Sequence, residues 1–432
     1  MVAAFAGAIL LGTALLSTSA AAAGPGNAPF QTALFTATSA VTVTGMTTVD
    51  TAGYWSPFGQ GVILALCQIG GLGIVTSASL LFLVVARRLG LRGRLATQVE
   101  TQGRDLGGGR GLILFIVGFT LAVEALIAAF LVGRLWIGLD EPFGTALWEG
   151  TFHAVTAFTD AGFSLYPDSL AGFATDGWFL LPIAAGIIVG GLGFPVWLEL
   201  RSRPASPSRW SLHTKLTLAM TGALLVVGVV AITALEWTNP LTLGAESPAG
   251  RVLGGFFSAV APRTAGFSVV DYAHMGTDSL LVTDMLMFVG GGSASTAGGI
   301  KVTTLAILFL IVWAELRGER EVVGFGRGIP APVLRQALTV AVIAINAVVL
   351  GTLAVIATND VDLSSALFEC VSAFSTAGLS IGLAPRLDGV GQAILMILMF
   401  LGRVGPLTLG VALVLRDRER LFTHPEERPL VG

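Results

Sequence analysis

Charged residues are scarce in this chain. Asp, Glu, Lys and Arg make up only 12% of its 432 residues, whereas hydrophobic residues make up 54%. Soluble domains usually contain about 25% charged residues, because their surfaces face water. The composition therefore argues against a large soluble helical protein and favours a chain that lies mostly within a membrane.

Cysteine and histidine are also rare. The chain has two cysteines, Cys67 and Cys370, both in apolar stretches, and four scattered histidines. They provide no disulfide framework and no ligand spacing for zinc or haem. We find no Ser-His-Asp arrangement and no phosphate-binding P-loop, so the sequence does not predict an enzyme. A membrane-embedded enzyme stays a remote alternative, and it would need a polar catalytic cluster that the sequence does not show.

No Lys or Arg precedes Arg87. The first 23 residues are apolar and end in alanines, which is typical of a signal peptide. A signal peptide, however, begins with a positively charged segment. The alternative is an outer transmembrane helix, and the internal repeat described below favours it.

Long apolar runs are abundant, and each is near the ~20 residues that a helix needs to cross a bilayer. Eight crossings are predicted, which places both ends of the chain on the same side. They lie near residues 2–22, 58–86, 111–137, 178–200, 215–236, 279–314, 332–357 and 389–415. Within each successive pair of crossings lies a moderately apolar segment that is too short and too polar to span.

Basic residues gather on one side of these predicted crossings. Eighteen of the 24 Lys and Arg lie there, within residues 87–110, 201–215, 317–335 and 416–428. The opposite side holds four, which are Arg134, Arg251, Arg263 and Arg386. Because cytoplasmic loops carry the excess of Lys and Arg, both termini are predicted to be cytoplasmic and the four short segments to open outward.

The four short segments share one pattern. They read FTATSAVTVTGMT (35–47), FHAVTAFTDAGFS (152–164), FFSAVAPRTAGFS (256–268) and FECVSAFSTAGLS (368–380). In each, a Phe stands ten residues before a Gly, an Ala five before it, and a Thr or Ser two after it. The glycines are Gly45, Gly162, Gly266 and Gly378. Each interval between them holds two crossings and one short segment, which indicates a fourfold repeated membrane unit.

The end of each short segment fits an ion path. A short helix that enters the membrane from outside points its partly negative C-terminal end at the bilayer midplane. Irregular backbone at that depth is tolerated only where it lines a cavity or is buried in protein. Glycine can adopt a positive φ, so four such segments around an axis can form a ring of carbonyl oxygens that replaces the hydration shell of a cation. The alternative, that Gly and Ala only permit close helix packing, explains one segment more easily than four in register.

The repeats resemble those of the Ktr/Trk/HKT superfamily of cation transporters. TVTGM, TDAGF, RTAGF and STAGL are similar to its four filter signatures. Further motifs extend the resemblance over nearly the whole chain: QIGGLGIVT (68–76), GGLGFPVW (190–197), SLHTKL (211–216), GGGSASTAGGIKVTT (290–304) and GRVGPLTL (402–409). The extra N-terminal helices of the Trk branch are missing, so the chain is most similar to the bacterial Ktr-type potassium-translocating membrane subunit.

The resemblance implies an all-α integral membrane protein. Four tandem repeats of outer helix, pore helix, filter and inner helix are expected around a pseudo-fourfold pore. The expected repeats are 1–100 with filter 42–47, 101–213 with filter 159–164, 214–330 with filter 263–268 and a gating loop at 290–299, and 331–432 with filter 375–380 and a cytoplasmic C-terminal tail.

The resemblance also implies which residues meet the ion. The expected filter residues are Val43, Thr44, Gly45, Asp160, Ala161, Gly162, Thr264, Ala265, Gly266, Thr376, Ala377 and Gly378. The expected gate residues are Gly290, Gly291, Gly292, Ser293, Ser295, Thr296, Gly298, Gly299, Lys301 and Arg403. Potassium is the expected ion, sodium is left open as a coupling ion, and no cofactor is expected in this chain.

The run from Gly290 to Gly299 interrupts the sixth predicted crossing. It contains five glycines and cannot form a strong helix. It is not a phosphate loop, because it follows an apolar helix rather than a strand and because Lys301 is not spaced as in a P-loop. We expect a gating loop below the filter, with a passive kink as the alternative.

Lys301 and Arg403 fall inside apolar runs, where a charge costs about 2.5–3.5 kcal/mol. Lys301 has the alternative of extending its ammonium to the cytoplasmic edge. Arg403 lies in the middle of its run, and in the family an Arg there lies near the pore. We expect it to act as an electrostatic barrier or as a latch for the loop.

Two acidic residues stand out beside the predicted filter. Asp160 replaces the family's more usual Asn, and the other repeats place no charge at that position. It is expected to accept hydrogen bonds from nearby backbone N–H groups, with a direct effect on the ion's field as the alternative. Glu369 is expected to be semi-buried at the start of the fourth pore helix, with a favourable contact to the helix dipole as the alternative to a functional role.

The predicted function is potassium uptake, with a sodium-conducting member of the same superfamily as the alternative. All four key filter positions are Gly, which favours potassium, whereas a Ser in the first repeat often marks sodium conduction in the plant relatives. The resemblance implies a homodimer in the inner (plasma) membrane, in contact with lipid. It also implies a separate cytoplasmic nucleotide-binding ring as regulator, and no nucleic-acid partner is expected.

Overall fold

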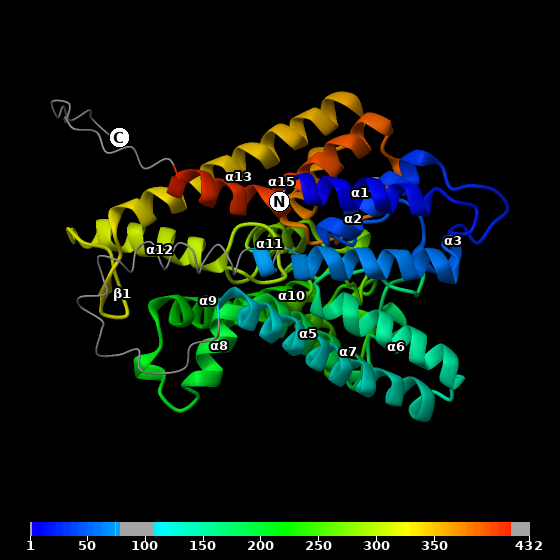
Figure 1. Cartoon of the computed structure of the whole chain (residues 1–432), viewed down its shortest axis with the longest axis horizontal. Coiled ribbons are helices and arrows are strands. Elements are labelled where there is room, and N and C mark those ends of the chain that lie inside the picture. The colour runs from blue at the N-terminus through cyan, green and yellow to red at the C-terminus, as the bar shows by residue number, and fades with distance from the viewer. Residues whose placement is uncertain (1, 74, 78–107, 416–432) are drawn as a thin grey trace.

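The computed structural model describes residues 2–73, 75–77 and 108–415, and it is mainly helical over them. Most of the predicted basic connection 87–110 and the predicted cytoplasmic tail 416–432 lie outside the described residues. Figure 1 shows the helix α3 (Thr51–Tyr54) near one end of the bundle, and α8 (Phe194–Ser202) near the opposite end together with the hairpin of β1 (Val323–Gly324) and β2 (Arg327–Gly328).

The element order repeats four times. The outer helices are α1 (Val2–Leu16), α5 (Gly108–Gly133), α9 (Leu212–Glu236) and α13 (Ala331–Thr358). The pore helices are α2 (Phe30–Thr42), α6 (Phe143–Phe158), α10 (Pro248–Val260) and α14 (Leu363–Ser375). The inner segments are Pro57–Ser77, α7 (Gly177–Leu192) with α8, α11 (Thr277–Phe288) with α12 (Val302–Leu316), and α15 (Gly389–Leu415). Short π and 3-10 turns join them: η1 (Arg134–Gly138), η2 (Ala171–Phe173), η3 (Pro207–Arg209), η4 (Leu243–Ala245), η5 (Tyr272–His274) and η6 (Ala384–Arg386).

Not every predicted crossing is one long helix. Among the described residues, four helices are long and apolar enough to cross a membrane, namely Pro57–Ser77, Gly111–Gly138, Leu212–Glu236 and Ala331–Thr358. A fifth candidate is the bent pair α7 and α8. The expected continuous crossings at 2–22 and 178–200 were wrong in detail, because the first is a shorter helix and the second is bent. The crossing at 279–314 is interrupted between α11 and α12, as predicted.

The two breaks have visible causes. The pair α7 and α8 bends by 93° at Gly193, which has φ 90° and ψ 145°. Only glycine adopts such a positive φ readily. The break between α11 and α12 is the predicted glycine-rich run, whose residues favour turns over helix.

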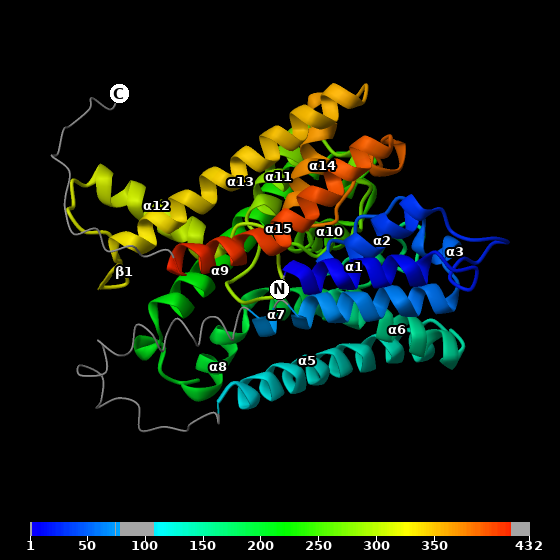
Figure 2. The same ribbon diagram turned by 45° about the horizontal axis from the view of Figure 1, so that its top comes forward.

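The pore helices begin at the edge of the bundle and end inside it. Ser247 caps α10 by accepting from the Gly250 N–H at 3.2 Å, and Asp362 caps α14 by accepting from the Ser365 N–H at 2.9 Å. Such caps satisfy backbone donors in the first turn of a helix. The residues toward the C-terminal end of each pore helix are almost all buried. Figure 2 shows α13 and α5 along opposite edges of the bundle, with α1, α2 and α10 between them.

The repeated Phe and Ala of the sequence are packing positions. Phe35, Phe152 and Phe368 are fully buried, whereas Phe256 is only partly buried and its neighbour Phe257 lies in the core instead. The alanines five residues before each filter glycine are all fully buried; they are Ala40, Ala157, Ala261 and Ala373. These residues anchor the four pore helices at one depth, which places the segments after them side by side.

Candidate functional site

The four segments that follow the pore helices share one backbone conformation. Each has a left-handed residue two positions before the repeated glycine, at φ 56° for Val43, 60° for Asp160, 70° for Thr264 and 52° for Thr376. The glycines are left-handed too, with φ between 65° at Gly162 and 82° at Gly45. The residue between them is not left-handed in any repeat. A non-glycine residue with positive φ is uncommon, so four at one repeat position mark a functional constraint.

The glycines place the four segments in a closed ring. A Cβ on Gly162 would lie 2.5 Å from the Ala265 carbonyl oxygen, and one on Gly266 would lie 3.0 Å from that of Ala377. A Cβ on Gly45 would collide with the Ala161 carbonyl oxygen, and one on Gly378 with that of Thr44. Each repeat therefore contacts the next in chain order, and the last contacts the first. We call this arrangement the carbonyl ring; its oxygens belong to Thr44, Ala161, Ala265 and Ala377.

The carbonyl ring is built from the expected filter residues. All twelve lie in these four segments, and all are buried except Gly266, which is partly buried. The C-terminal, partly negative ends of the pore helices lie directly before them. Such an arrangement can replace the hydration shell of a dehydrated cation.

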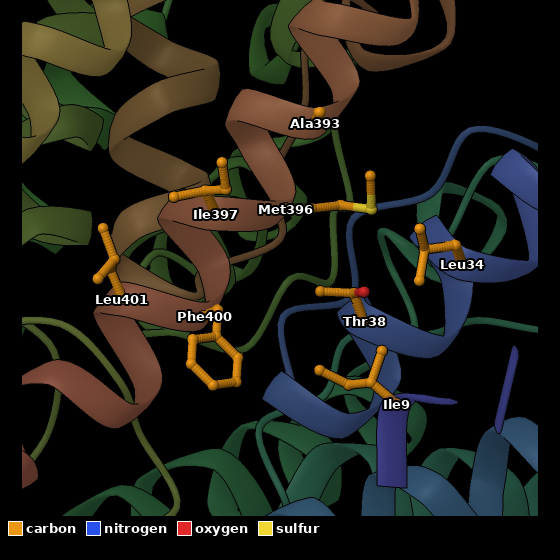
Figure 3. Close-up of a pocket in the computed structure, with 8 residues that line it drawn as sticks. All are labelled: Ile9, Leu34, Thr38, Ala393, Met396, Ile397, Phe400 and Leu401. Atoms are coloured by element: carbon orange, nitrogen blue, oxygen red, sulfur yellow. The ribbon is translucent and has the colours of Figure 1, made fainter. Parts of the chain in front are cut away.

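Two other kinds of site, a side-chain metal cluster and an apolar groove, are weaker candidates for binding a cation than the carbonyl ring. Among the described residues, no group of three or more His, Cys, Asp and Glu could hold a metal ion. A groove of about 330 Å³ lies between α15 and the first repeat. In Figure 3, Met396 and Phe400 face Leu34 and Ile9 across it. Thr38 supplies the one hydroxyl among its lining residues. A groove lined by carbon cannot replace water around a cation.

Inner-helix glycines support the ring from behind. A Cβ on Gly70 would collide with the Val41 carbonyl oxygen, one on Gly190 with that of Phe158, and one on Gly402 with that of Phe374. Each of these carbonyls belongs to the residue four positions before a filter glycine. In three repeats, the motifs QIGGLG, GGLGF and GRVG therefore contain the glycine at which the inner helix closely contacts the end of its pore helix.

The predicted gating loop lies against the base of the carbonyl ring. Its two ends are joined, because the Gly290 N–H donates to the Ile300 carbonyl at 2.9 Å and the Val302 N–H donates to that of Gly291 at 3.0 Å. A Cβ on Gly298 would lie 2.8 Å from the Ser375 carbonyl oxygen and would collide with the Thr376 hydroxyl. The glycines of the loop are needed for this close contact with the fourth repeat.

The loop also pairs with the bend in the second repeat. The Gly292 N–H donates to the Gly191 carbonyl at 2.7 Å, and the Phe194 N–H donates to the Ala294 carbonyl at 3.2 Å. A Cβ on Gly193 would lie 2.5 Å from the Ser293 carbonyl oxygen. The bend and the loop therefore fit one another, a relation between distant segments that the sequence did not reveal.

Lys301 and Arg403 are both tied to this loop. The Arg403 side chain is 3% exposed, and its Nη1 donates to the Thr296 carbonyl. The Lys301 ammonium donates to the Ala297 carbonyl at 2.5 Å, so it turns back to the loop rather than reaching toward an edge. This geometry agrees with a latch at Arg403.

Asp160 also contacts the loop. Its Oδ2 accepts from the Thr296 hydroxyl at 2.9 Å, and the side chain is fully buried. The expected partners, backbone N–H groups of its own repeat, were wrong. Asp160 therefore joins the second filter segment to the predicted gating loop, and its bracing role stays a prediction.

Replacing Asp160 by Asn is expected to preserve ion selectivity and to change apparent ion affinity less than tenfold, or under about 1.4 kcal/mol. Asn keeps an oxygen that accepts from Thr296 and has nearly the same shape. The check is concentration-dependent uptake by the variant in proteoliposomes, with protein level and assembly measured alongside. A larger affinity loss would show that the negative charge itself acts on the ion.

Arg263 was counted from the sequence among the four basic residues on the outer side, and it also begins the predicted third filter segment 263–268. It is 6% exposed, and its guanidinium donates to the Thr221 carbonyl at 3.1 Å and to the Gly290 carbonyl at 3.4 Å. The residue follows α10 directly and so lies inside the bundle with the filter segment. Its place three residues before Gly266, within the filter signature, was the available signal.

Glu369 was expected at the start of the fourth pore helix, but α14 begins at Leu363 and its cap is Asp362. Glu369 is instead fully buried in the middle of that helix. Its Oε1 accepts from the Ser380 hydroxyl at 2.6 Å, beyond the filter glycine. No residue spacing or motif in the sequence predicts this contact.

Comparison with known proteins agrees with this architecture. The sequence model of the TrkH family, described as a cation transport protein, matches residues 10–423. The chain belongs to the TrkH family. Membership confirms the expected superfamily, and it confirms a multi-pass all-α membrane transporter rather than an enzyme.

Named relatives of this TrkH-family chain include potassium uptake proteins. It is 41% identical to the Ktr system potassium uptake protein B of Bacillus subtilis, over 87% of this chain and 84% of the relative. It is 37% identical to the protein of the same name from Vibrio alginolyticus, over 93% and 88%. It is 35% identical to the potassium/sodium uptake protein NtpJ of Enterococcus hirae, over 93% and 90%.

A solved structure shows the same fold. The crystal structure of the potassium transporter TrkH from Vibrio parahaemolyticus matches with a TM-score of 0.72 at 18% identity, over 96% of this chain and 85% of that chain. At this identity the match concerns the fold alone.

Proposed function

We propose that this TrkH-family chain takes up potassium through the carbonyl ring. The observation that carries the proposal is the ring itself, in which four segments with the same alternating left-handed backbone meet around their glycines. Backbone carbonyls at fixed positions suit an ion that must shed its water. The names of the relatives in Bacillus subtilis and Vibrio alginolyticus support potassium as that ion.

A sodium-conducting transporter is the second candidate. The relative from Enterococcus hirae is named a potassium/sodium uptake protein, and this name supports sodium as an alternative ion. The glycine at all four key positions favours potassium, because none of the four carries a side chain that could re-aim its carbonyls. Sodium stays open as a coupling ion rather than as the main substrate.

The loop from Gly290 to Gly299 is the proposed gate. It lies against filter residues of the second and fourth repeats and is held by Asp160 and Arg403. An element in this place can obstruct the path at the base of the ring. Movement of the loop away from Arg403 is the proposed opening step.

The flux of both ions tests the proposed function. Purified protein in liposomes is expected to move potassium down its gradient and to move sodium far more slowly under the same conditions. Equal rates would favour the sodium alternative or a poorly selective transporter. Protein-free liposomes and the Gly45→Ser variant provide the controls.

The proposed setting is the inner (plasma) membrane, with both termini cytoplasmic. The excess of basic residues in the connections on one side supports this orientation. The proposed assembly is a homodimer of pore chains with a cytoplasmic nucleotide-binding ring.

We expect the solubilised chain to have the mass of a dimer and to co-purify with such a ring. Light scattering in detergent and mass spectrometry of the co-purified proteins provide the measurement. A chain that stays monomeric and never retains the ring would contradict the assembly.

A further inference from the structure

Beyond each filter glycine the chain turns back toward the edge of the bundle. We call the residues two to five positions after the glycine the exit segment. In the fourth repeat Glu369, nine residues before Gly378, holds this segment. Its Oε1 accepts from the Ser380 hydroxyl at 2.6 Å, the Ile381 N–H at 3.1 Å and the Leu383 N–H at 3.2 Å. The Ser380 hydroxyl oxygen in turn accepts from the Gly382 N–H at 2.9 Å.

The second repeat builds the same arrangement from a different side chain. His153 stands nine residues before Gly162, and its Nε2 lies 3.1 Å from the Ser164 hydroxyl. The Leu165 N–H donates to the same Nε2 at 3.3 Å, and the Tyr166 N–H donates to the Ser164 hydroxyl oxygen at 3.1 Å. Relative to the glycine, these are the same positions as in the fourth repeat.

The tautomer of His153 follows from its other nitrogen. Nδ1 lies 2.7 Å from the Glu149 carbonyl oxygen, which can only accept. Nδ1 therefore carries the hydrogen, and Nε2 is the acceptor in a neutral ring. His153 thus presents a single acceptor to its exit segment, as the Oε1 atom of Glu369 does.

The remaining two repeats lack this acceptor. Thr36 and Phe257 occupy the position nine residues before Gly45 and Gly266. Thr36 Oγ1 is buried with no hydrogen-bond partner among the described residues, and Phe257 has no polar atom. The exit segment of the third repeat is tied to the second repeat instead, because the Ser268 N–H donates to the Ser169 hydroxyl at 3.0 Å.

We propose that His153 and Glu369 are positioning residues that set ion selectivity by holding two exit segments. Because the repeats follow one another around the carbonyl ring, the second and fourth lie opposite each other. The two side chains therefore restrain opposite quarters of the ring, and the first repeat is the least restrained. This inference rests on the proposed role of the ring as a selectivity filter.

The physical reason is the short distance along the chain. In both repeats one restrained N–H, that of Leu165 or Ile381, lies only three residues beyond the filter glycine, so its position limits how far the ring carbonyls can turn. A buried N–H without its acceptor is unfavourable, and the segment would shift to find another partner. A ring with one shifted quarter would discriminate less between ions of different size.

The test replaces the acceptor while keeping the shape. His153→Phe keeps an aromatic ring at the position where the third repeat naturally has Phe257, and Glu369→Leu removes the carboxylate. We expect each to lower the ratio of potassium to sodium uptake in proteoliposomes at least tenfold. Glu369→Gln keeps an acceptor oxygen and is expected to stay within threefold of the unchanged protein.

Thr36→Val is the matched control. It changes the equivalent position in the first repeat, where the hydroxyl has no partner, and it should leave the ratio unchanged. Melting temperature and dimer content report whether each variant folds, and His153→Phe carries the test if Glu369→Leu does not fold.

Three results would overturn the inference. The first is an unchanged ratio in folded His153→Phe, and the second is an equal loss in Thr36→Val. The third is a loss in Glu369→Gln as large as in Glu369→Leu, which would assign the effect to charge. The proposed filter is tested separately by Gly45→Ser. If this variant keeps the unchanged protein's ratio of potassium to sodium uptake, the filter proposal fails. If Gly45→Ser lowers that ratio while the His153 and Glu369 variants keep it, only the positioning role fails.

Discussion

Replacing Gly45 by serine is expected to lower the ratio of potassium to sodium uptake at least tenfold and to reduce potassium uptake itself. Gly45 has φ 82°, which a serine adopts only with strain. The new Cβ would collide with the Ala161 carbonyl oxygen, so that carbonyl must turn or move. One oxygen of the ring would then no longer face the ion as the others do. Uptake of both ions in proteoliposomes gives the measurement.

Gly73→Ser is the control for this change. Gly73 belongs to the first repeat, does not have a positive φ, and has open space where a Cβ would lie. It should keep both the ratio and the uptake rate. An unchanged ratio of potassium to sodium uptake in folded Gly45→Ser would contradict the proposed filter.

Arg403→Ala is expected to raise the rate of potassium uptake. The Arg403 side chain donates to the Thr296 carbonyl and so holds the loop at the base of the carbonyl ring. Loss of one partner from a buried hydrogen bond costs about 1–3 kcal/mol, which would shift the closed loop toward open by roughly 5- to 150-fold. Deletion of the loop from Gly290 to Gly299 is expected to raise the rate as well. Initial rates of uptake per folded protein provide the measurement.

Arg386→Ala removes an exposed arginine near the exit segment of the fourth repeat and should leave the rate unchanged. The obvious risk is that loss of a buried guanidinium unfolds the protein, so Thr296→Val serves as a milder variant. It removes only the hydroxyl that donates to Asp160 and should also raise the rate. Equal or lower rates in folded variants would give the loop a structural role instead.

Sequence reasoning identified the repeats because their signals are local. The Phe, Ala and Gly of each short segment act within one pore helix and its next turn, so their spacing alone predicts four equivalent segments. The positive φ at Val43 or Thr264, by contrast, cannot be predicted from the residue type, since β-branched side chains disfavour it. Only the ring formed with the neighbouring repeat explains it.

Contacts between segments far apart in the chain could not be predicted from the sequence, for a different reason. Arg263 was counted only for its charge on the outer side, and the sequence did not indicate its hydrogen bonds to Thr221 and Gly290 within the bundle. His153 and Glu369 are different residue types, so the sequence does not show that they are equivalent. Each nevertheless offers one hydrogen-bond acceptor nine residues before its filter glycine. The bend at Gly193 could not be predicted from its own segment, because it is shaped by contact with the loop from Gly290 to Gly299.

The central claim is that the carbonyl ring binds the transported ion, and locating a bound ion tests it most directly. Rubidium or thallium(I), which substitute for potassium and scatter anomalously, can be added to crystals of the purified protein. We predict anomalous density on the axis of the ring, within coordination distance of the carbonyl oxygens of Thr44, Ala161, Ala265 and Ala377. Density that appears only elsewhere in the protein, with none at the ring, would contradict the account.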